Sequence, residues 1–288
     1  MREFDSLSIS WEFVEYEESA VVLLLAPYEA TVCRGKGTSA GPGALINSFL
    51  DLELYDVDLR YCPSDVGIAL MGLNLRGLKP PEAVLAVRDK AALILGDGKF
   101  PVLVGGEHTL SVGMVEALSG YYGDLSVLQL DAHADLREEY GGEKYNHACV
   151  SSLIREYVDC VQVGIRSMSS KEAQLIREGG YKIFYSSDIH DNNSWFNKAL
   201  DGLTDDVYLS LDLDVLDSSI MPSVGTPEPG GLGWHQVVDL IGLLCEKKNV
   251  VGFDIMELSP IKGLHAPDYL AASLLYKIIG LRYLGGLG

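Results

Sequence analysis

The chain has 288 residues, of which 48% are hydrophobic and 22% are charged, a composition typical of a globular protein that can bury a large core. Its formal net charge of -19 argues against a nucleic-acid partner, because phosphate binding needs clustered Lys and Arg. The same charge argues against adhesion to anionic membranes and is compatible with a small cationic substrate.

The N-terminal segment, residues 1–19, is acidic and lacks the basic start and apolar core of a secretory signal. We assign it no role. The most apolar run, 20–26, is too short to span a bilayer. The five cysteines are scattered and form no CxxC pair, as expected for reduced thiols. These features predict a cytoplasmic protein without a membrane partner.

Strand-like and helix-like segments alternate along the chain. The expected strands are 20–26, 52–57, 100–104, 126–130, 161–165, 182–185, 207–213 and 250–255. The expected helices are 41–50, 81–95, 110–121, one beginning near 147, 169–178, 236–247 and 267–279. Loops rich in Gly or Pro are expected at 33–38 and 222–233. Most of the strands are apolar on both faces, which is typical of a parallel sheet covered by helices on both sides. We therefore expect a single α/β domain over 1–288, with three αβα layers and a mainly parallel sheet.

A short motif directly after the expected strand 126–130 carries possible metal ligands at alternate positions, Asp131, His133 and Asp135. In extended backbone, alternate side chains point to the same side, so these three are expected to face one point, with the intervening alanines pointing away. Two carboxylates and an imidazole share a small volume at low cost only if a cation neutralises them. The motif therefore predicts a metal site.

Three further strand ends carry polar residues: His108, the pair Asp212 and Asp214, and Glu257. A single His at a strand end is most often a hydrogen-bonded structural residue, and acidic residues there commonly cap the next helix. However, the ligand site of a parallel sheet lies beyond the carboxyl ends of its strands. Their joint occurrence with the first motif therefore predicts one shared site.

Apart from Glu257, these residues form a ligand set with two imidazoles, four carboxylates and no thiolate. Oxygen-rich sites with imidazole suit Mn²⁺ better than zinc or copper(I). Six ligating side chains exceed what one ion needs, whereas two ions that share bridging carboxylates use them all. Ions about 3.5–4 Å apart can also hold a water or hydroxide between them.

The motifs Gly-Gly-Glu-His-Thr at 105–109, Asp-Ala-His-Ala-Asp at 131–135 and Ser-Leu-Asp-Leu-Asp-Val-Leu-Asp at 210–217 resemble those of the ureohydrolases, the family of arginase and agmatinase. The loop Gly-Thr-Pro-Glu-Pro-Gly-Gly at 225–231 is also similar, and the similarity runs from about residue 20 to 280. This chain has Glu107, Thr109 and Ser218 where the family usually has Asp, Ser and Pro. These departures remove no ligand, but they leave the path of the loop 218–224 open.

The resemblance implies a binuclear manganese hydrolase, with two Mn²⁺ per subunit, in which a metal-bridging hydroxide attacks a guanidino carbon. It assigns one ion to His108, Asp131, Asp135 and Asp212, and the other to Asp131, His133, Asp212 and Asp214. It implies that Glu257 holds the substrate guanidinium and that His147 carries a proton. Without the resemblance, Glu257 is more simply a solvated strand-end acid and His147 a residue in the first turn of a helix. Ureohydrolases are typically trimers or hexamers, so we expect a homotrimer or homohexamer.

The stretch 164–169 carries serines where arginases place the acids that grip the α-amino group of arginine. A serine supplies no charge to pair with an ammonium. The stretches 135–140 and 146–148 are similar to agmatinases of the shorter prokaryotic type. We therefore expect a small cationic guanidino substrate, agmatine, to be hydrolysed to putrescine and urea.

Several alternatives remain open. The substrate could be N1-aminopropylagmatine, guanidinobutyrate or arginine, or the enzyme could cleave another C–N bond, as formimidoylglutamases and the distantly related deacetylases do. Arg137, if it faces the pocket, would favour a carboxylated substrate; otherwise it would pair on the surface with Glu138, Glu139 or Glu143. A non-catalytic binding protein on this fold would be expected to have lost at least one ligand, and all six are present here, which argues against that alternative.

Overall fold

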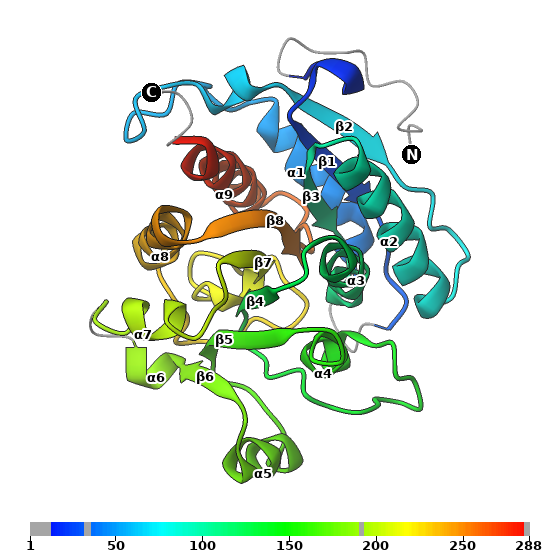
Figure 1. Cartoon of the computed structure of the whole chain (residues 1–288), viewed down its shortest axis with the longest axis vertical. Coiled ribbons are helices and arrows are strands. Elements are labelled where there is room, and N and C mark those ends of the chain that lie inside the picture. The colour runs from blue at the N-terminus through cyan, green and yellow to red at the C-terminus, as the bar shows by residue number, and fades with distance from the viewer. Residues whose placement is uncertain (1–12, 32–35, 190–192, 285–288) are drawn as a thin grey trace.

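The computed structural model describes residues 13–31, 36–189 and 193–284. An eight-stranded sheet with the order β2-β1-β3-β8-β7-β4-β5-β6 runs through them (Figure 1), and every neighbouring pair of strands is parallel. The strands are β1 Val21–Ala26, β2 Ile68–Gly72, β3 Phe100–Gly105, β4 Leu125–Leu130, β5 Asp159–Ile165, β6 Lys182–Tyr185, β7 Asp206–Asp212 and β8 Asn249–Met256. The helices are α1 Gly41–Phe49, α2 Pro80–Gly96, α3 Ser111–Tyr121, α4 Val150–Ile154, α5 Ser170–Glu178, α6 Ser186–Ile189, α7 Phe196–Leu200, α8 Trp234–Lys247 and α9 Ala266–Tyr283.

Both faces of the sheet are covered by helices because the central strands carry apolar side chains on both faces. In β1, Val21, Leu23 and Leu25 belong to the core shared with α1, α8 and α9. The alternate residues Val22 and Leu24 belong to the core shared with α2, α3 and α4. Successive side chains of a strand point to opposite faces of the sheet, and here both faces are buried. The predicted three-layer αβα class is thereby confirmed.

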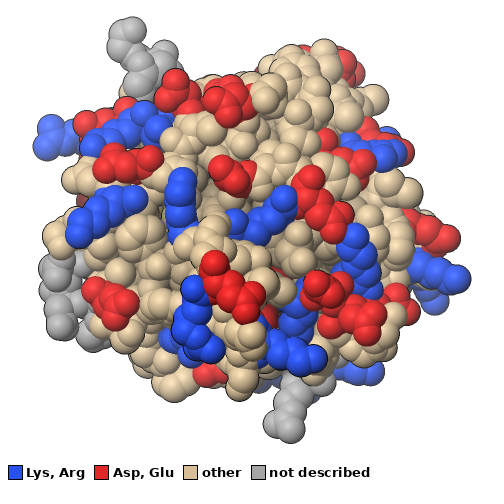
Figure 2. Space-filling view, turned by 60° about the horizontal axis from the view of Figure 1, so that its bottom comes forward, with Lys and Arg blue, Asp and Glu red and all other residues tan. Residues whose placement is uncertain are grey.

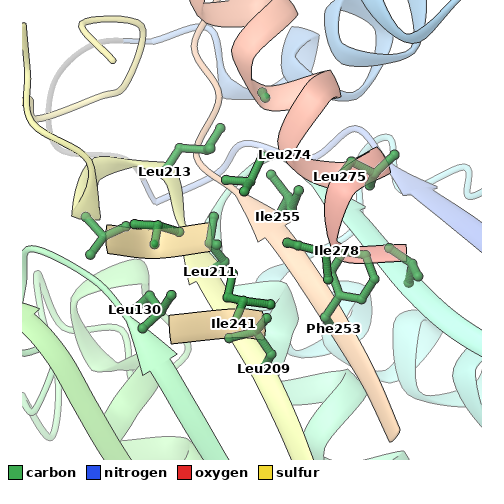
Figure 3. Close-up of a cluster of buried hydrophobic side chains, with 14 of the residues drawn as sticks. Leu130, Leu209, Leu211, Leu213, Ile241, Phe253, Ile255, Leu274, Leu275 and Ile278 are labelled. Atoms are coloured by element: carbon green, nitrogen blue, oxygen red, sulfur yellow. The ribbon is translucent and has the colours of Figure 1, made fainter. Parts of the chain in front are cut away.

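The centre of the first core lies over β4, β7 and β8. Figure 3 shows Leu209, Leu211, Phe253 and Ile255 from the strands beneath Ile241 and other aliphatic side chains of α8 and α9. Each of these five side chains is at most 1% exposed. Burial of one such side chain contributes about 1.5–3 kcal/mol. The strands whose ends carry the polar motifs are therefore held by fully buried apolar side chains.

The expected strand 52–57 is wrong, and the edge strand is β2 instead. Asp56 explains the difference, because its carboxylate accepts the backbone N–H groups of Asp58 and Leu59 and its own N–H donates to the carbonyl of Tyr61. These bonds close a turn that leaves Val57 76% exposed. The short helices α6 and α7 were also missed by the sequence analysis.

The other expected elements are found within a few residues of their predicted bounds. Of the acidic segment 1–19, residues 1–12 lie outside the described part of the chain, and 16–18 form a short 3₁₀ helix. Residues 33–35 of the expected Gly-rich loop likewise lie outside it. Among the described helices, none is both long and apolar enough to cross a membrane.

Candidate metal centre

Four polar strand ends meet because their strands are neighbours in the sheet, in the order β3-β8-β7-β4. His108 opens a 3₁₀ helix after β3, Glu257 follows β8, Asp212 closes β7 and Asp131 follows β4. These ends come from positions up to about 150 residues apart in the sequence, and the parallel arrangement places them at one edge. The predicted shared site is thus assembled by the strand order.

The first cluster consists of His108, Asp131 and Asp212, all buried. The Nδ1 atom of His108 lies 3.1 Å from Oδ2 of Asp212 and 3.4 Å from Oδ2 of Asp131. Oδ2 of Asp135 lies 4.0 Å from the same nitrogen. Neither of the two shorter contacts is a hydrogen bond, and Nδ1 has no hydrogen-bond partner among the described residues.

These separations fit a shared metal ion. Two ligand atoms, each about 2.1 Å from one ion and about 90–110° apart, are themselves about 3.0–3.4 Å apart. Nδ1 of His108 and the two carboxylate oxygens have this spacing. A buried nitrogen without a proton acceptor, beside two carboxylates, is an orphaned ligand atom that a cation would satisfy.

The second cluster consists of Asp131, His133 and Asp214. Nδ1 of His133 lies 2.7 Å from Oδ2 of Asp214 and 3.8 Å from Oδ1 of Asp131. Asp131 therefore belongs to both clusters, each oxygen facing a different histidine. Asp212 joins only the first cluster by ligand-atom distance, although its Oδ1 accepts the backbone N–H of Asp214.

A hydrogen bond at Nε2, on the side of the ring away from the carboxylates, fixes the orientation of His108. Its Nε2 lies 3.0 Å from Oγ of Ser210, which donates its hydrogen to Asp254. Asp254 also accepts from Tyr208 and from the backbone N–H of Leu211. Because Ser210 has given its proton to Asp254, it accepts one from Nε2, which leaves the Nδ1 lone pair facing the carboxylates. A carboxylate behind a ligating histidine is a common support of metal sites.

The charges show that the cluster needs a compensating cation. Burial and the neighbouring carboxylates raise the pKa of Asp135 and of Asp212 well above the ordinary value. Burial opposes a charged His133, but Asp214, Asp131 and Asp135 outweigh it and raise its pKa to about 11. The raised pKa values of Asp135, Asp212 and His133 all show that added positive charge is favourable in this cluster.

Two residues of the site have left-handed backbone. Asp135 has φ 50° and Glu257 has φ 65°, a region that costs a residue with a Cβ about 1–3 kcal/mol. The expectation that Asp131, His133 and Asp135 continue one extended segment is therefore wrong at Asp135. Likewise, Asp214 lies in a 3₁₀ helix, Leu213–Val215, rather than on an extension of β7. Ala132 and Ala134 are buried, as expected.

A cavity of about 240 Å³ opens above the clusters. Its floor is lined by the cluster residues His108, His133, Asp135, Asp212 and Asp214. Glu257 and His147 line the same cavity, together with the apolar surfaces of Met168 and Tyr140. Burial raises the pKa of Glu257 to about 8, against the lowering effect of the His108 backbone N–H, which donates to it at 2.7 Å. Burial also lowers the pKa of His147.

Comparison with known proteins agrees with this geometry. The model of the arginase family matches residues 19–280. The chain belongs to the arginase family. It is 38% identical over 274 residues to the N(1)-aminopropylagmatine ureohydrolase of Synechocystis, covering 92% of this chain and 90% of that protein. It is 40% identical to the enzyme of that name from Thermus thermophilus, covering 93% of this chain and 92% of the relative.

Agmatinases are similar over the whole chain as well. The agmatinase of Pyrococcus horikoshii is 31% identical, covering 96% of this chain and 97% of the relative. The crystal structure of the agmatine ureohydrolase of Thermoplasma volcanium has a TM-score of 0.88 and 31% identity, covering 99% of this chain and 98% of that one. The predicted ureohydrolase activity class is thereby confirmed for this arginase-family enzyme.

Arg137 lies at the rim of the cavity and pairs with a residue that the sequence did not indicate. Its Nε is 3.6 Å from Oε2 of Glu172, and its guanidinium lies 4.5 Å from the ring centroid of Tyr140. Glu172 is 5% exposed and also accepts the backbone N–H groups of Leu136 and Ser169. The partner therefore comes from α5 and not from the neighbouring Glu138, Glu139 or Glu143.

The loop after Asp214 has a defined path despite Ser218. Arg166 donates to carbonyls on both sides of it, at Asp214 (2.6 Å) and Glu228 (2.9 Å). The carboxylate of Asp217 accepts the backbone N–H groups of Gly230 and Gly231. A Cβ on Gly231 would lie 2.6 Å from the backbone nitrogen of Asp217, so only glycine allows this approach.

This loop gives the arginase-family enzyme an acid-sensitive contact. Hydrogen bonds from Ser219, Gly231 and Gly230 lower the pKa of Asp217 from 3.8 to about 2. A carboxyl group with a lowered folded-state pKa stabilises the fold fully above its unfolded pKa and loses that contribution as the pH falls through the folded value. Asp217→Asn should therefore lower the urea midpoint at pH 6, and the difference from wild type should shrink as the pH falls from about 4 towards 2. A difference that grows on acidification would contradict this assignment.

Some supporting residues carry no recognisable sequence motif. Gln129 donates to Oδ2 of Asp131 at 2.8 Å and accepts from Ser151. The available sequence signal for Gln129 was its polar side chain within the mostly apolar strand β4. Thr31 and Glu172 reach the site from loops and helices distant in sequence, and no spacing rule points to them.

Proposed function

We propose that this ureohydrolase hydrolyses N1-aminopropylagmatine to spermidine and urea with two Mn²⁺ ions per subunit. The single observation that carries the reaction type is the pair of His/Asp clusters that share Asp131 on the floor of a cavity also lined by Glu257 and His147. As the family resemblance implies, His108, Asp131, Asp135 and Asp212 would hold one ion, and Asp131, His133, Asp212 and Asp214 would hold the other. When bound, the two ions lower the pKa of water and supply the nucleophile.

Glu257 is proposed to bind the guanidinium of the substrate. Burial raises the pKa of its carboxyl group to about 8, and a guanidinium beside it would stabilise the charged form. Carboxylate and guanidinium form bidentate hydrogen bonds that fix both position and orientation. The backbone N–H of His108 holds Glu257 in place, so the guanidinium carbon is kept above the metal ligands.

His147 is proposed to transfer the proton that the leaving amine needs. The overall reaction adds one water to the guanidinium and releases urea and a protonated amine, so a proton must reach the amine nitrogen as the C–N bond breaks. Burial lowers the pKa of His147, which favours the neutral imidazole that can accept a proton and pass it on.

The choice of substrate rests on the relatives and on the wall of the cavity. Relatives named for N1-aminopropylagmatine are 35–40% identical, whereas the agmatinase of Pyrococcus horikoshii is 31% identical. Ser167 and Ser169 line the wall where arginine would need an acid, and Met168 and Tyr140 offer apolar surface to a methylene chain. Agmatine, the substrate expected from the sequence, is the second candidate because the structural neighbour from Thermoplasma volcanium is an agmatine ureohydrolase.

A urea-release assay decides between these substrates. The Mn²⁺-loaded enzyme should show a higher kcat/KM for N1-aminopropylagmatine than for agmatine, and both should exceed guanidinobutyrate and arginine. A preference for agmatine would make it an agmatinase, and arginine as the best substrate would refute the proposal. No urea from any of the four compounds would favour another C–N hydrolase.

The expected homotrimer or homohexamer and the cytoplasmic location stay predictions. Sedimentation velocity checks the first, since a fully active monomer would contradict it. Figure 2 shows a face on which basic and acidic side chains are interspersed, so the net charge of -19 is not gathered there into one acidic surface.

A further inference from the structure

A chain of hydrogen bonds links a buried carboxylate to the ring of His147. Oγ1 of Thr31 donates to Oε1 of Glu107 at 2.6 Å. The same Oγ1 lies 3.2 Å from Nδ1 of His147 and 3.2 Å from the backbone nitrogen of His147. Thr31 follows β1 and His147 precedes α4, so a single hydroxyl joins two segments 116 residues apart.

The first link of this chain has a fixed direction. Glu107 is 0% exposed and receives four hydrogen bonds, from the N–H groups of Ala30 and Thr31 and from the hydroxyls of Thr31 and Thr109, at 2.6–2.7 Å. These four donors match the four lone-pair positions of an ionised carboxylate. The hydroxyl proton of Thr31 is therefore directed at Glu107.

The second link follows from the donor and acceptor inventory of a hydroxyl group. A threonine hydroxyl has one proton to give and two lone pairs to accept with. With its proton on the Glu107 side, Oγ1 can only accept, and its two lone pairs face the backbone N–H and Nδ1 of His147. Nδ1 must then carry the proton of a neutral imidazole, which leaves the lone pair on Nε2.

We propose that Thr31 is a positioning residue that holds neutral His147 as the Nδ1–H tautomer. The inference rests on the proposed proton-transfer role of His147 and deepens it by naming the atom, Nε2, that takes up the proton. The Nδ1–H bond to Thr31 also fixes the rotation of the ring, together with the edge-to-face packing of Tyr140 at a centroid distance of 6.1 Å. Nε2 accepts a proton as the nucleophile forms and returns it to the leaving amine, so Nδ1 stays protonated throughout the cycle.

Glu107 acts through Thr31 and not directly on the ring. An ionised carboxylate that orients a hydroxyl, which in turn orients an imidazole, performs the task that a carboxylate performs directly in a Ser-His-Asp triad. The hydroxyl keeps the charge of Glu107 away from the ring. This arrangement explains why His147 keeps a lowered pKa although a carboxylate lies nearby: burial outweighs the opposing effect of Glu107.

The test begins with the unmodified protein. The ¹⁵N shifts of the imidazole nitrogens, recorded on the metal-free protein and on the protein loaded with diamagnetic Mg²⁺ and assigned with His147→Gln, report the tautomer of His147 directly. We expect Nδ1–H in both states. An Nε2–H tautomer would overturn the proposal without any variant having to fold.

Thr31→Val and Thr31→Ser form the matched pair, because valine keeps the branched shape without the hydroxyl and serine keeps the hydroxyl without the branch. In Thr31→Val the Nδ1–H signal should weaken in favour of Nε2–H, and kcat should fall by about 10–100-fold, the usual cost of removing a partner that orients a histidine. KM should change much less, and Thr31→Ser should recover most of kcat. A wild-type kcat in Thr31→Val, or a loss of kcat with an unchanged tautomer, would each overturn the proposal.

Failure of this inference is distinguishable from failure of the proposed function. If the wild-type enzyme releases no urea from any guanidino substrate, the function is wrong, while the tautomer measurement still stands or falls by itself. If urea is released but His147 is the Nε2–H tautomer, the function stands and the role of Thr31 is wrong. Bound metal, measured on each variant, should equal the wild-type content, because Thr31 touches neither cluster in the structure.

Discussion

Asp131→Asn is expected to abolish urea release and to lower the affinity for metal at both positions. Asp131 is the one residue that belongs to both clusters, and each of its oxygens faces a different histidine. An amide keeps the shape and can still accept the backbone N–H of His133, but it offers no charge to bridge two cations. Loss of a residue that merely supports a ligand costs about 10–100-fold in metal affinity, and loss of a shared ligand should cost more.

Stability should change in the opposite direction in the metal-free protein. Removing one of four close carboxylates relieves repulsion, and we expect this to outweigh the loss of the hydrogen bond from Gln129, so metal-free Asp131→Asn should unfold at the same temperature as wild type or above it. Addition of Mn²⁺ should then raise the Tm of wild type and leave that of the variant nearly unchanged, because only the native site binds the ion. Metal content after equilibrium dialysis, Tm and urea release measure the three effects together.

Asp205→Asn is the matched control, because it makes the same chemical change on a fully exposed side chain. Asp205 lies just before β7, at the amino-terminal end of the strands and far from their carboxyl ends. This variant should match wild type in all three measurements. A variant at Asp131 that keeps two ions per subunit and full activity would refute the bridging role.

Glu257→Gln is expected to lower kcat/KM by about 10²–10³-fold while the enzyme keeps its metal. Truncating or neutralising one partner of a buried, hydrogen-bonded charge pair costs about 2–5 kcal/mol, and each 1.4 kcal/mol is tenfold. Glutamine can still accept the His108 N–H and keeps the side-chain length, so the backbone at φ 65° need not move. The loss should therefore come from the missing charge opposite the guanidinium.

Steady-state kinetics and metal analysis of Glu257→Gln separate this role from metal binding. An exposed glutamate of α8, Glu246, provides the control substitution Glu246→Gln, which should leave both readings at wild-type values. If Glu257→Gln loses its metal and its activity in parallel, then Glu257 supports the clusters and does not hold the substrate.

Much of the fold could be predicted because the strands are apolar at successive positions. Runs of apolar residues located β1, β3, β4, β7 and β8 to within one or two residues. A parallel sheet covered by helices on both sides follows from such strands. The edge strand β2 escaped because 52–57 is at least as strand-like as 68–72 by composition. A local event, the carboxylate of Asp56 closing a turn, decides between them, and strand propensity does not contain it.

The candidate site shows the same division between pattern and local geometry. Asp131, His133 and Asp214 could be brought together from sequence because each lies at a strand end of a parallel sheet. The left-handed backbone of Asp135 could not be predicted from the sequence, because the contacts that impose it are tertiary. Arg137 illustrates the same limit. Its neighbours in sequence are acidic, yet it pairs with Glu172, which α5 presents from 35 positions further on.

The position of β8 also has a consequence for how the polypeptide is made. The last strand to emerge is inserted between β3 and β7, which pair with each other only through it. Without β8, the strands β2-β1-β3 and β7-β4-β5-β6 have no pairing between them, and β3 and β7 each lack a partner on the inner side. His108 follows the first group of strands, and Asp131 and Asp212 belong to the second. The residues proposed to bind metal therefore lie on both strand groups, and capture of an ion by the complete proposed set has to wait for the C-terminal strand.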